Sequence, residues 1–300
     1  MDKKINFNNE GLIFDNGINI SNCNKNNGPM KEDEEENKPN SLLYSTKVTC
    51  PVCDNVFNTT TVKSSAYRII NKDSDFFIRY SLINPYFYDV WVCNSCGYAA
   101  MKSDFKTLRK IEIDLVYKLI TPKWRGRTYP KIYDVNTAIE RYKLSLLNYV
   151  IINAKASKKA TNCLKLAWMY RLLGTENAKE MEQRYLTQSL EELCGAYYVE
   201  TFPLYGMDKY SIMYLIGELN RRTGHSDQSL IWFSSVITTP DVKKKLKELA
   251  RDMKDLIKKD ETTNEKSSSL VVPNNSSSVN NPDEDNTAKK SGFLSKLFKH

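Results

Sequence analysis

The sequence predicts an α+β fold in which a small antiparallel β-ribbon precedes an α-helical repeat region and both ends of the chain are disordered. Three observations lead to this prediction. Two C-x2-C pairs frame a segment rich in β-branched and aromatic residues, which is typical of short strands. Apolar residues recur at helical spacing from about residue 104 onward. The two ends are polar and contain few apolar side chains.

The predicted domain boundaries follow these changes in composition. Residues 1–46 form an acidic, Asn-rich arm, and residues 260–290 form a linker dominated by Ser, Asn and Asp. Neither segment has enough apolar side chains to offset the entropy lost on ordering, so both are predicted to be disordered. Residues 47–103 are predicted as the ribbon domain and residues 104–259 as the helical domain. Residues 291–300 form a short amphipathic motif.

Net charge follows the same division. The whole chain carries +8, the first 47 residues carry −2 and the last 41 carry −1, which leaves +11 on the folded part. A basic surface suits nucleic acid, acidic peptides or anionic lipid, although lysines solvated on helix faces are the favoured explanation. The basic residues are scattered along the helical part, and Lys243–Lys245 is the one run of three.

The first residues predict a cytoplasmic location. They are polar, and no apolar signal segment follows them. No run approaches the ~18 apolar residues of a membrane span. In a reducing compartment, paired cysteines favour metal or redox chemistry over disulfides.

Four cysteines form the candidate metal site: Cys50, Cys53, Cys93 and Cys96. Each C-x2-C turn brings two sulfurs to one side of an ion, and two such turns supply the tetrahedral thiolate shell of structural Zn²⁺. Pro51 stiffens the first turn, and Gly97 can take the left-handed conformation that the second turn needs. Iron held as in rubredoxin uses the same ligands, and dithiol redox chemistry is a further alternative.

The 39 residues between the two pairs predict an antiparallel ribbon with an inserted hairpin or loop. Residues 58–70 are rich in β-branched side chains, later residues alternate aromatics, and Asn84 with Pro85 marks a turn. The aromatic side chains are expected to pack around the metal site. The spacer also carries polar residues that either pair internally or form a binding surface: Arg68, Asp73, Asp75, Arg79, Tyr80 and Asp89.

Residues 103–122 predict one helix, capped by Ser103 or Asp104 and ended by Pro122. Residues 215–240 predict a helix pair that resembles a tetratricopeptide repeat. In that pair Gly217 permits close contact, Ser229 is small at the crossing and Phe233 fills the core. Gly224 makes the turn and Pro240 ends the pair. A generic helical bundle remains the alternative.

Stacked helix pairs leave a concave groove, which suits an acidic peptide or a peptide with a free C-terminal carboxylate. The repeat frame puts five residues on its inner face: Trp168, Arg171, Tyr214, Arg221 and Arg222. The two adjacent arginines are equally compatible with a solvated turn.

Three stretches, "CPVC", "INPYFYDVWVCNSCGYAAMKSDF" and "LKLAWMYRLLG", together resemble a bacterial domain-of-unknown-function family numbered 2225. The resemblance runs from about residue 47 to about residue 257. It implies a four-cysteine metal ribbon followed by tetratricopeptide-like helices. It implies no activity, since none is assigned to the family.

The C-terminal motif "SGFLSKLFKH" interrupts a polar tail. On a short helix its four large apolar side chains share one face: Phe293, Leu294, Leu297 and Phe298. The motif is expected to make a peripheral membrane contact, to dock on a partner or on this protein's own groove, or to have no role.

The residues do not predict an enzyme. The chain has two histidines, His225 beside Gly224 and His300 at its end, and it shows no phosphate-binding Gly-rich loop and no open metal site. The leading prediction is a protein-interaction adaptor that binds a protein or peptide through its helical groove. The alternative is RNA or DNA binding through the zinc ribbon and its basic surface. No small-molecule substrate is predicted.

Overall fold

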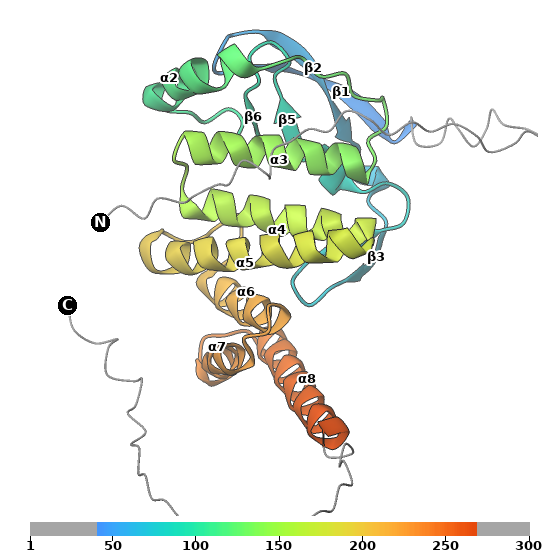
Figure 1. Cartoon of the computed structure of the whole chain (residues 1–300), viewed down its shortest axis with the longest axis vertical. Helices are drawn as coiled ribbons and strands as arrows, with labels where there is room; N and C mark the ends of the chain where they lie inside the picture. Colours follow the sequence, from blue (N-terminus) through green and yellow to red (C-terminus); the bar gives the residue numbers. More distant parts are fainter. Residues whose placement is uncertain (1–40, 269–300) are drawn as a thin grey trace, which may run out of the picture. The chain divides into compact units, whose positions relative to one another are not determined.

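The structure, a computed structural model, describes residues 41–268 and confirms the α+β class (Figure 1). The described chain divides into two compact units, each built from several stretches. Unit 1 comprises residues 41–73, 77–154 and 168–178, and unit 2 comprises residues 74–76, 155–167 and 179–268. Among the described helices, none is long and apolar enough to span a membrane. The C-terminal motif with Phe293 and Phe298 lies outside the described residues.

Unit 1 contains three separate two-stranded antiparallel sheets. Strand β1 (Leu43–Thr49) pairs with β2 (Val56–Val62), β3 (Ile69–Lys72) with β4 (Ile78–Tyr80), and β5 (Val90–Val92) with β6 (Ala99–Met101). The predicted ribbon with an inserted hairpin is therefore confirmed. A lone two-stranded sheet is at best marginally stable in water, so these strands need other elements to hold them.

Short 3-10 turns and two helices complete unit 1. The turns are η2 (Ser64–Ala66), η3 (Pro85–Tyr88) and η4 (Thr121–Lys123), and the helices are α2 (Lys110–Leu119) and α3 (Val135–Ile151). Asn84 caps η3, as the predicted turn requires, because its side chain accepts a hydrogen bond from the Tyr86 amide. Helix α3 packs against β5 and β6 (Figure 1). Its Arg141 side chain is buried and donates to the Val90 carbonyl.

The start of α2 corrects the sequence prediction. The helix begins at Lys110, not at Ser103 or Asp104. Phe105 is fully buried, and Asp104 accepts a hydrogen bond of 2.7 Å from the Tyr149 hydroxyl, so residues 102–106 form turns that place Phe105 in the core. The spacing of the apolar residues Phe105 and Leu108 is typical of a helix, but tertiary packing of Phe105 overrides this local preference.

The two units do not follow the predicted boundary at residues 103/104. Helices α2 and α3 belong to unit 1 with the strands. Helices α4 (Ala156–Leu173) and α5 (Glu176–Val199) each contribute residues to both units, since residues 168–178 belong to unit 1. The sequence pattern gives helices but not which core each helix joins.

Unit 2 also contains α6 (Lys209–Arg222), α7 (Ser226–Thr238) and α8 (Lys244–Ser268), which extends past the predicted domain end at residue 259. The expected features of the α6/α7 pair are confirmed. A Cβ at Gly217 would lie 2.9 Å from the Phe233 ring, and the Ser229 hydroxyl donates to the Gly217 carbonyl at 2.7 Å. Gly224 makes the turn with φ +82°. The core of this unit is apolar and continuous from α6 through α8.

Candidate metal centre

The first cysteine pair lies on the turn that joins β1 to β2. The Cys50 amide donates to the Asn55 carbonyl at 2.9 Å, and the Asp54 amide donates to the Cys50 carbonyl at 3.0 Å. Asp54, directly after Cys53, has a left-handed φ of 55°. Asp is one of the few non-glycine residues that enter this region readily. The turn therefore folds back tightly enough to bring both sulfurs to one side.

The second pair repeats this geometry between β5 and β6. The Cys93 amide donates to the Tyr98 carbonyl at 2.8 Å, and the Gly97 amide donates to the Cys93 carbonyl at 2.9 Å. Gly97 has φ +80°, as the sequence predicted. Two hairpins far apart in the sequence thus end in turns with the same hydrogen bonds.

The two turns bring all four sulfurs together. Every Sγ lies within 4.8 Å of the others, and the Cys50–Cys96 and Cys53–Cys93 sulfur pairs are each 3.6 Å apart. Sulfurs at about 2.3 Å from a tetrahedrally bound ion are about 3.8 Å from one another. Cys53 is half-buried and the other three thiols are buried. This donor set fits one soft divalent cation.

Hydrogen bonds within the quartet distribute its protons unequally. The bond to Cys93 raises the pKa of Cys50 to about 12, and the bond to Cys50 raises the pKa of Cys96 as well. The bonds from Cys50 and Cys96 lower the pKa of Cys93. Four thiolates at this spacing repel one another, and a bound cation would offset that repulsion.

A segment after α2 covers the second turn. A Cβ at Gly97 would lie 2.7 Å from the Trp124 ring, so only glycine leaves room for the indole. Trp124 Nε1 donates to the Asn94 carbonyl at 2.9 Å, and the Arg127 amide donates to Asn94 Oδ1 at 2.6 Å. The Thr121 hydroxyl donates to the Cys96 carbonyl at 3.1 Å. Sequence reasoning missed this cover, because no local pattern links residues 30 positions apart.

An aromatic core lies beside the sulfur quartet, as predicted. The Phe105 ring contacts the rings of Phe57, Trp91 and Tyr98 at centroid distances of 5.9, 5.5 and 4.9 Å. Each of these three residues lies on or beside a strand that directly precedes or follows a cysteine turn. The core and the metal site therefore fix the same two hairpins.

Comparison with known proteins identifies the family of this chain. The sequence model of a bacterial family described as "Uncharacterized protein conserved in bacteria (DUF2225)" matches residues 43–257. The chain belongs to this family. No curated protein and no solved structure matches it. The family match confirms the resemblance predicted from the cysteine and aromatic stretches, and it assigns no activity.

Two of the predicted groove residues lie in unit 1. Trp168 is buried and stacks on Phe77 with ring centroids 5.1 Å apart. Arg171 pairs with Asp73 at 3.1 Å, and Arg79 also pairs with Asp73, at 2.9 Å. Burial opposes ionisation of Asp73, but the hydrogen bonds from the two arginines lower its pKa. These side chains are engaged within unit 1, and the internal ion pairs predicted for the spacer are confirmed for Asp73 and Arg79.

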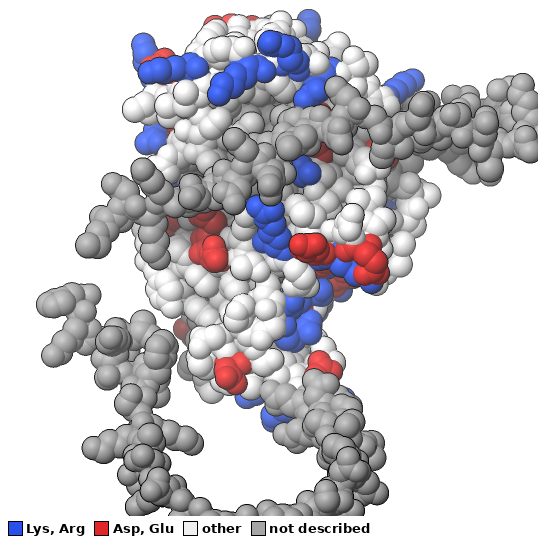
Figure 2. All heavy atoms as spheres, in the orientation of Figure 1, with Lys and Arg blue, Asp and Glu red and all other residues white. Residues whose placement is uncertain are grey.

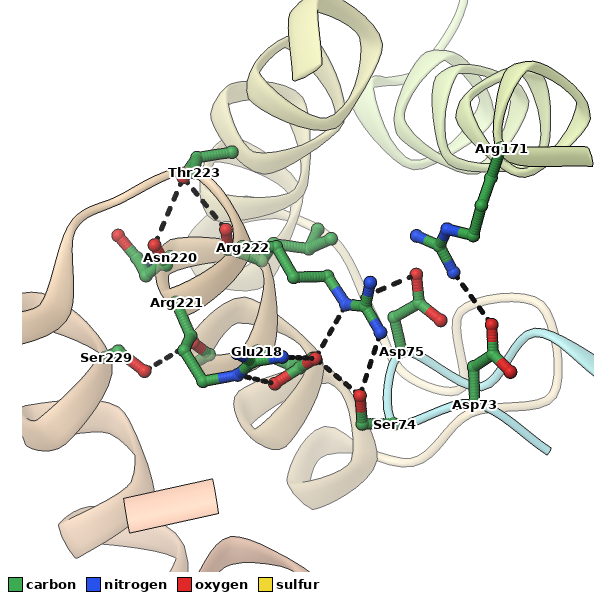
Figure 3. Close-up of polar contacts among 12 residues, drawn as sticks. Asp73, Ser74, Asp75, Arg171, Glu218, Asn220, Arg221, Arg222, Thr223 and Ser229 are labelled. Carbon is green, nitrogen blue, oxygen red and sulfur yellow. Dashed lines mark hydrogen bonds and ion pairs between the residues drawn. The ribbon is translucent and has the colours of Figure 1, made fainter. Parts of the chain in front are cut away.

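The other three, Tyr214, Arg221 and Arg222, lie on α6 in unit 2, and Figure 3 shows the two arginines. Tyr214 is fully buried against Phe76 and Phe233. The buried Glu218 carboxylate accepts hydrogen bonds from Arg221 and Arg222, and a peptide groove that uses these residues stays a prediction.

The carboxylate of Glu218 was not singled out from the sequence. Its spacing of three and four residues from the two arginines is the local signal that identifies this pairing. The Ser74 hydroxyl also donates to Glu218, at 2.6 Å, and Asp75 lies 3.7 Å from Arg222 (Figure 3). No sequence pattern links Ser74 or Asp75 to α6.

The positive surplus of the folded part comes from two segments, both in the helical part of the chain. Residues 102–131 include nine basic and three acidic residues, and residues 243–259 include eight and three. These two segments, net +6 and +5, account for the whole surplus of +11 between residues 48 and 259. Figure 2 shows Lys and Arg side chains gathered around α2 with little acidic surface between them.

Proposed function

We propose that this protein is a non-enzymatic interaction protein in which Zn²⁺ holds unit 1 in shape and unit 2 binds a partner protein. The buried quartet supports the structural part of the proposal. Four protein sulfurs complete a tetrahedral shell, so no coordination position remains for water or substrate. The bound ion would supply a cross-link between the β1–β2 and β5–β6 hairpins. Iron would take the same ligands, and metal analysis distinguishes the two.

The part of the chain that the structure describes supports a non-enzymatic role. Within residues 41–268, the cysteine quartet is the one group of three or more His, Cys, Asp or Glu side chains placed to hold a metal. His225 is exposed in the turn after α6, and its Nδ1 lies 2.9 Å from the Thr223 hydroxyl. A histidine tied to its own turn has no neighbour set for acid–base catalysis.

One observation carries the binding part: the C-terminal end of α5 exposes apolar side chains. Tyr198 and Val199 are 74% and 85% exposed, the largest exposures among the large hydrophobic residues that the structure describes. Side chains of this kind, gathered together, mark interaction sites. Apolar residues that unit 2 leaves in water can be buried against a partner.

Aromatic neighbours extend this exposed end into a surface. The Tyr197 ring contacts the rings of Tyr198, Phe202 and Trp232 at centroid distances of 5.2, 5.8 and 5.3 Å. We call Tyr197, Tyr198, Val199, Phe202 and Trp232 the α5-end surface. Tyrosine and tryptophan are enriched at binding interfaces because one side chain offers both apolar area and a polar tip.

The charge beside the α5-end surface indicates the partner's chemistry. Lys209 Nζ lies 5.8 Å from the centroid of the Tyr197 ring. Lys243 contributes a favourable charge near Asp208, which caps α6. The partner is therefore an acidic segment with apolar side chains, and the tetratricopeptide-like arrangement proposed for the α6/α7 pair suits such a ligand.

Crosslinking and capture of the full-length protein from its native host tests this function. We expect a defined protein to be enriched with the wild type and lost with the double variant Tyr198→Ser, Val199→Ser. The matched control is Ile70→Ser with Leu82→Ser, which removes two exposed apolar side chains, 65% and 59% exposed, from unit 1. Capture that is the same for both variants, or that recovers no protein, would contradict the proposal.

A further inference from the structure

A basic surface lies in unit 1 and contains none of the residues of the α5-end surface. Six exposed cations belong to α2, η4 and the residues beside them; we call them the α2 surface: Lys106, Arg109, Lys110, Lys118, Lys123 and Arg125. Helix α2 has ten residues, so the cations before and after it are separated by about 15 Å of helix. That length accommodates several phosphates of an extended polyanion.

Acidic side chains do not neutralise this surface. Glu112 pairs with Arg109 at 2.9 Å, and Asp104 accepts the hydrogen bond of Tyr149. Asp114 is the remaining acidic residue of residues 102–131, and it is exposed. Residues 102–131 contain nine basic and three acidic residues, so a net positive charge remains.

The metal centre accounts for part of that surplus. Four thiolates around one divalent cation carry a net charge of −2, and nearby cations stabilise such a centre. A net charge of +6 in residues 102–131 exceeds this requirement. The excess is available to an external anion.

Aromatic side chains lie among the same cations. Tyr117 is 48% exposed on α2, one residue before Lys118. Trp124 lies between Lys123 and Arg125, and the Arg127 guanidinium is 5.9 Å from its ring centroid. Recognition of a single strand has two requirements. Cations must lie along the sugar–phosphate backbone, and aromatic rings among them must be available for bases to stack on.

We propose that the α2 surface binds single-stranded nucleic acid, with its phosphates on the lysines and arginines and a base on Tyr117. Tyr117 favours nucleic acid over a lipid surface, because its exposed ring lies among the cations and can stack on a base. Val116 is fully buried, and α2 packs against α3. On the outer side Asp114 lies among Lys110, Tyr117 and Lys118, whereas Ile111 and Leu119 are 63% and 42% exposed, so binding to lipid vesicles is measured beside binding to the oligomer.

The test is fluorescence anisotropy of the metal-loaded, full-length protein with a labelled single-stranded 20-nucleotide oligomer of mixed sequence. We expect the logarithm of affinity to fall with the logarithm of salt concentration with a slope of about −4, since each phosphate contact contributes about −0.7. Lys106→Gln, Lys118→Gln and Lys123→Gln together should reduce that slope by about 2 and weaken binding about tenfold or more at 50 mM salt. Tyr117→Ala should weaken binding about tenfold and leave the slope unchanged.

The matched control removes the same charge from the other basic segment: Lys244→Gln, Lys245→Gln and Lys258→Gln. We expect affinity within about twofold of the wild type for this variant. Metal content and circular dichroism verify that all variants are folded. Three results would overturn the proposal: no binding at low salt, loss of binding with the control variant only, or equal affinity for duplex and single strand in both Tyr117→Ala and wild type.

Vesicles of anionic phospholipid provide a further arm. If they bind the full-length protein through Lys106, Lys118 and Lys123 while the oligomer does not bind, the α2 surface is a lipid surface and the proposal is wrong. Binding of the oligomer without binding to these vesicles supports it.

Discussion

The two units are held together in different ways. Unit 1 relies on strands of three to seven residues, paired two by two, and on four sulfurs from two distant hairpins. Unit 2 relies on helices of 13 to 25 residues around a continuous apolar core that includes Tyr214 and Phe233. A bound metal would therefore add one local cross-link to the aromatic core and helices of unit 1, whereas the stability of unit 2 is spread over many apolar contacts. This difference predicts that folding of unit 1 depends on a bound metal and that folding of unit 2 does not.

The largest effect is expected from a substitution that unfolds unit 1 and leaves unit 2 folded. Cys93→Ser removes one ligand of the quartet, and structural zinc sites contribute about 10–16 kcal/mol of folding free energy. We expect loss of bound metal and of the near-ultraviolet circular dichroism of unit 1, which contains Trp91, Trp124 and Trp168 of the four tryptophans. Far-ultraviolet helical signal from unit 2 should remain.

Cys163→Ser is the control for this prediction. Cys163 is also a buried thiol, on α4 in unit 2, but it lies outside the quartet. We expect it to keep the metal and to cost about 1–2 kcal/mol. Equal behaviour of the two variants would remove the distinction between the units.

The reciprocal substitution destabilises unit 2 and leaves unit 1 and its metal content unchanged. Phe233 is fully buried and touches the face of α6 at Gly217. Phe233→Ala should lower the free energy of unfolding of unit 2 by about 4 kcal/mol, because it leaves a cavity in the core. Urea unfolding followed by helical circular dichroism measures the loss. Metal content measured on the same samples should not change, and release of metal at the urea concentration that melts unit 2 would contradict independent stabilisation.

Two glycines with positive φ test how much the Trp124 contact contributes to the metal centre. Gly97 and Gly206 both have positive φ, +80° and +77°, but only at Gly97 would a Cβ meet another side chain within 4 Å. Gly97→Ala should cost about 3 kcal/mol, from backbone strain and from displacement of Trp124. Gly206→Ala should cost about 1 kcal/mol, from strain alone. Thermal melts of both variants test this, and equal costs would show that the Trp124 contact contributes nothing.

The smallest effect concerns the carboxylate that joins two arginines in unit 1. Asp73 has a lowered pKa despite the burial that opposes its ionisation, because Arg79 and Arg171 donate to it. Its contribution is therefore fully present above the ordinary Asp pKa of about 3.9 and is lost as the pH falls through the lowered value. Asp73→Asn should cost about 2 kcal/mol at neutral pH, and the difference from the wild type should shrink in acid.

Denaturant melts between neutral pH and pH 2 measure this dependence. Asp114→Asn on the exposed side of α2 is the control and should stay within about 0.5 kcal/mol of the wild type throughout. A difference for Asp73→Asn that stays constant down to pH 2 would refute the ionic explanation.

The sequence predicted the features that depend on local geometry. The C-x2-C turns, the left-handed Gly97, and the close contact at Gly217 with Ser229 and Phe233 each follow from residues a few positions apart. In each case the backbone or the helix crossing requires a particular residue type. Such requirements are visible in a single sequence.

The features that depend on distant contacts were not predictable in this way. Trp168 and Tyr214 have the helical spacing expected of a groove, but Phe77 and Phe76, which follow β3, cover them. Phe105 imitates a helix start, but its ring completes the aromatic core. Trp124 covers Gly97 from 27 residues away. Local patterns set which side of an element is apolar, and tertiary packing decides what covers it.

Hydrogen exchange measured by mass spectrometry, before and after removal of the metal with a strong chelator, tests the central claim most directly. We expect chelation to abolish amide protection in residues 48–101, which hold the strands and cysteine turns, and to leave residues 209–257 protected. Purified protein that contains no metal, or chelated protein that keeps full protection in residues 48–101, would contradict a metal-dependent unit 1.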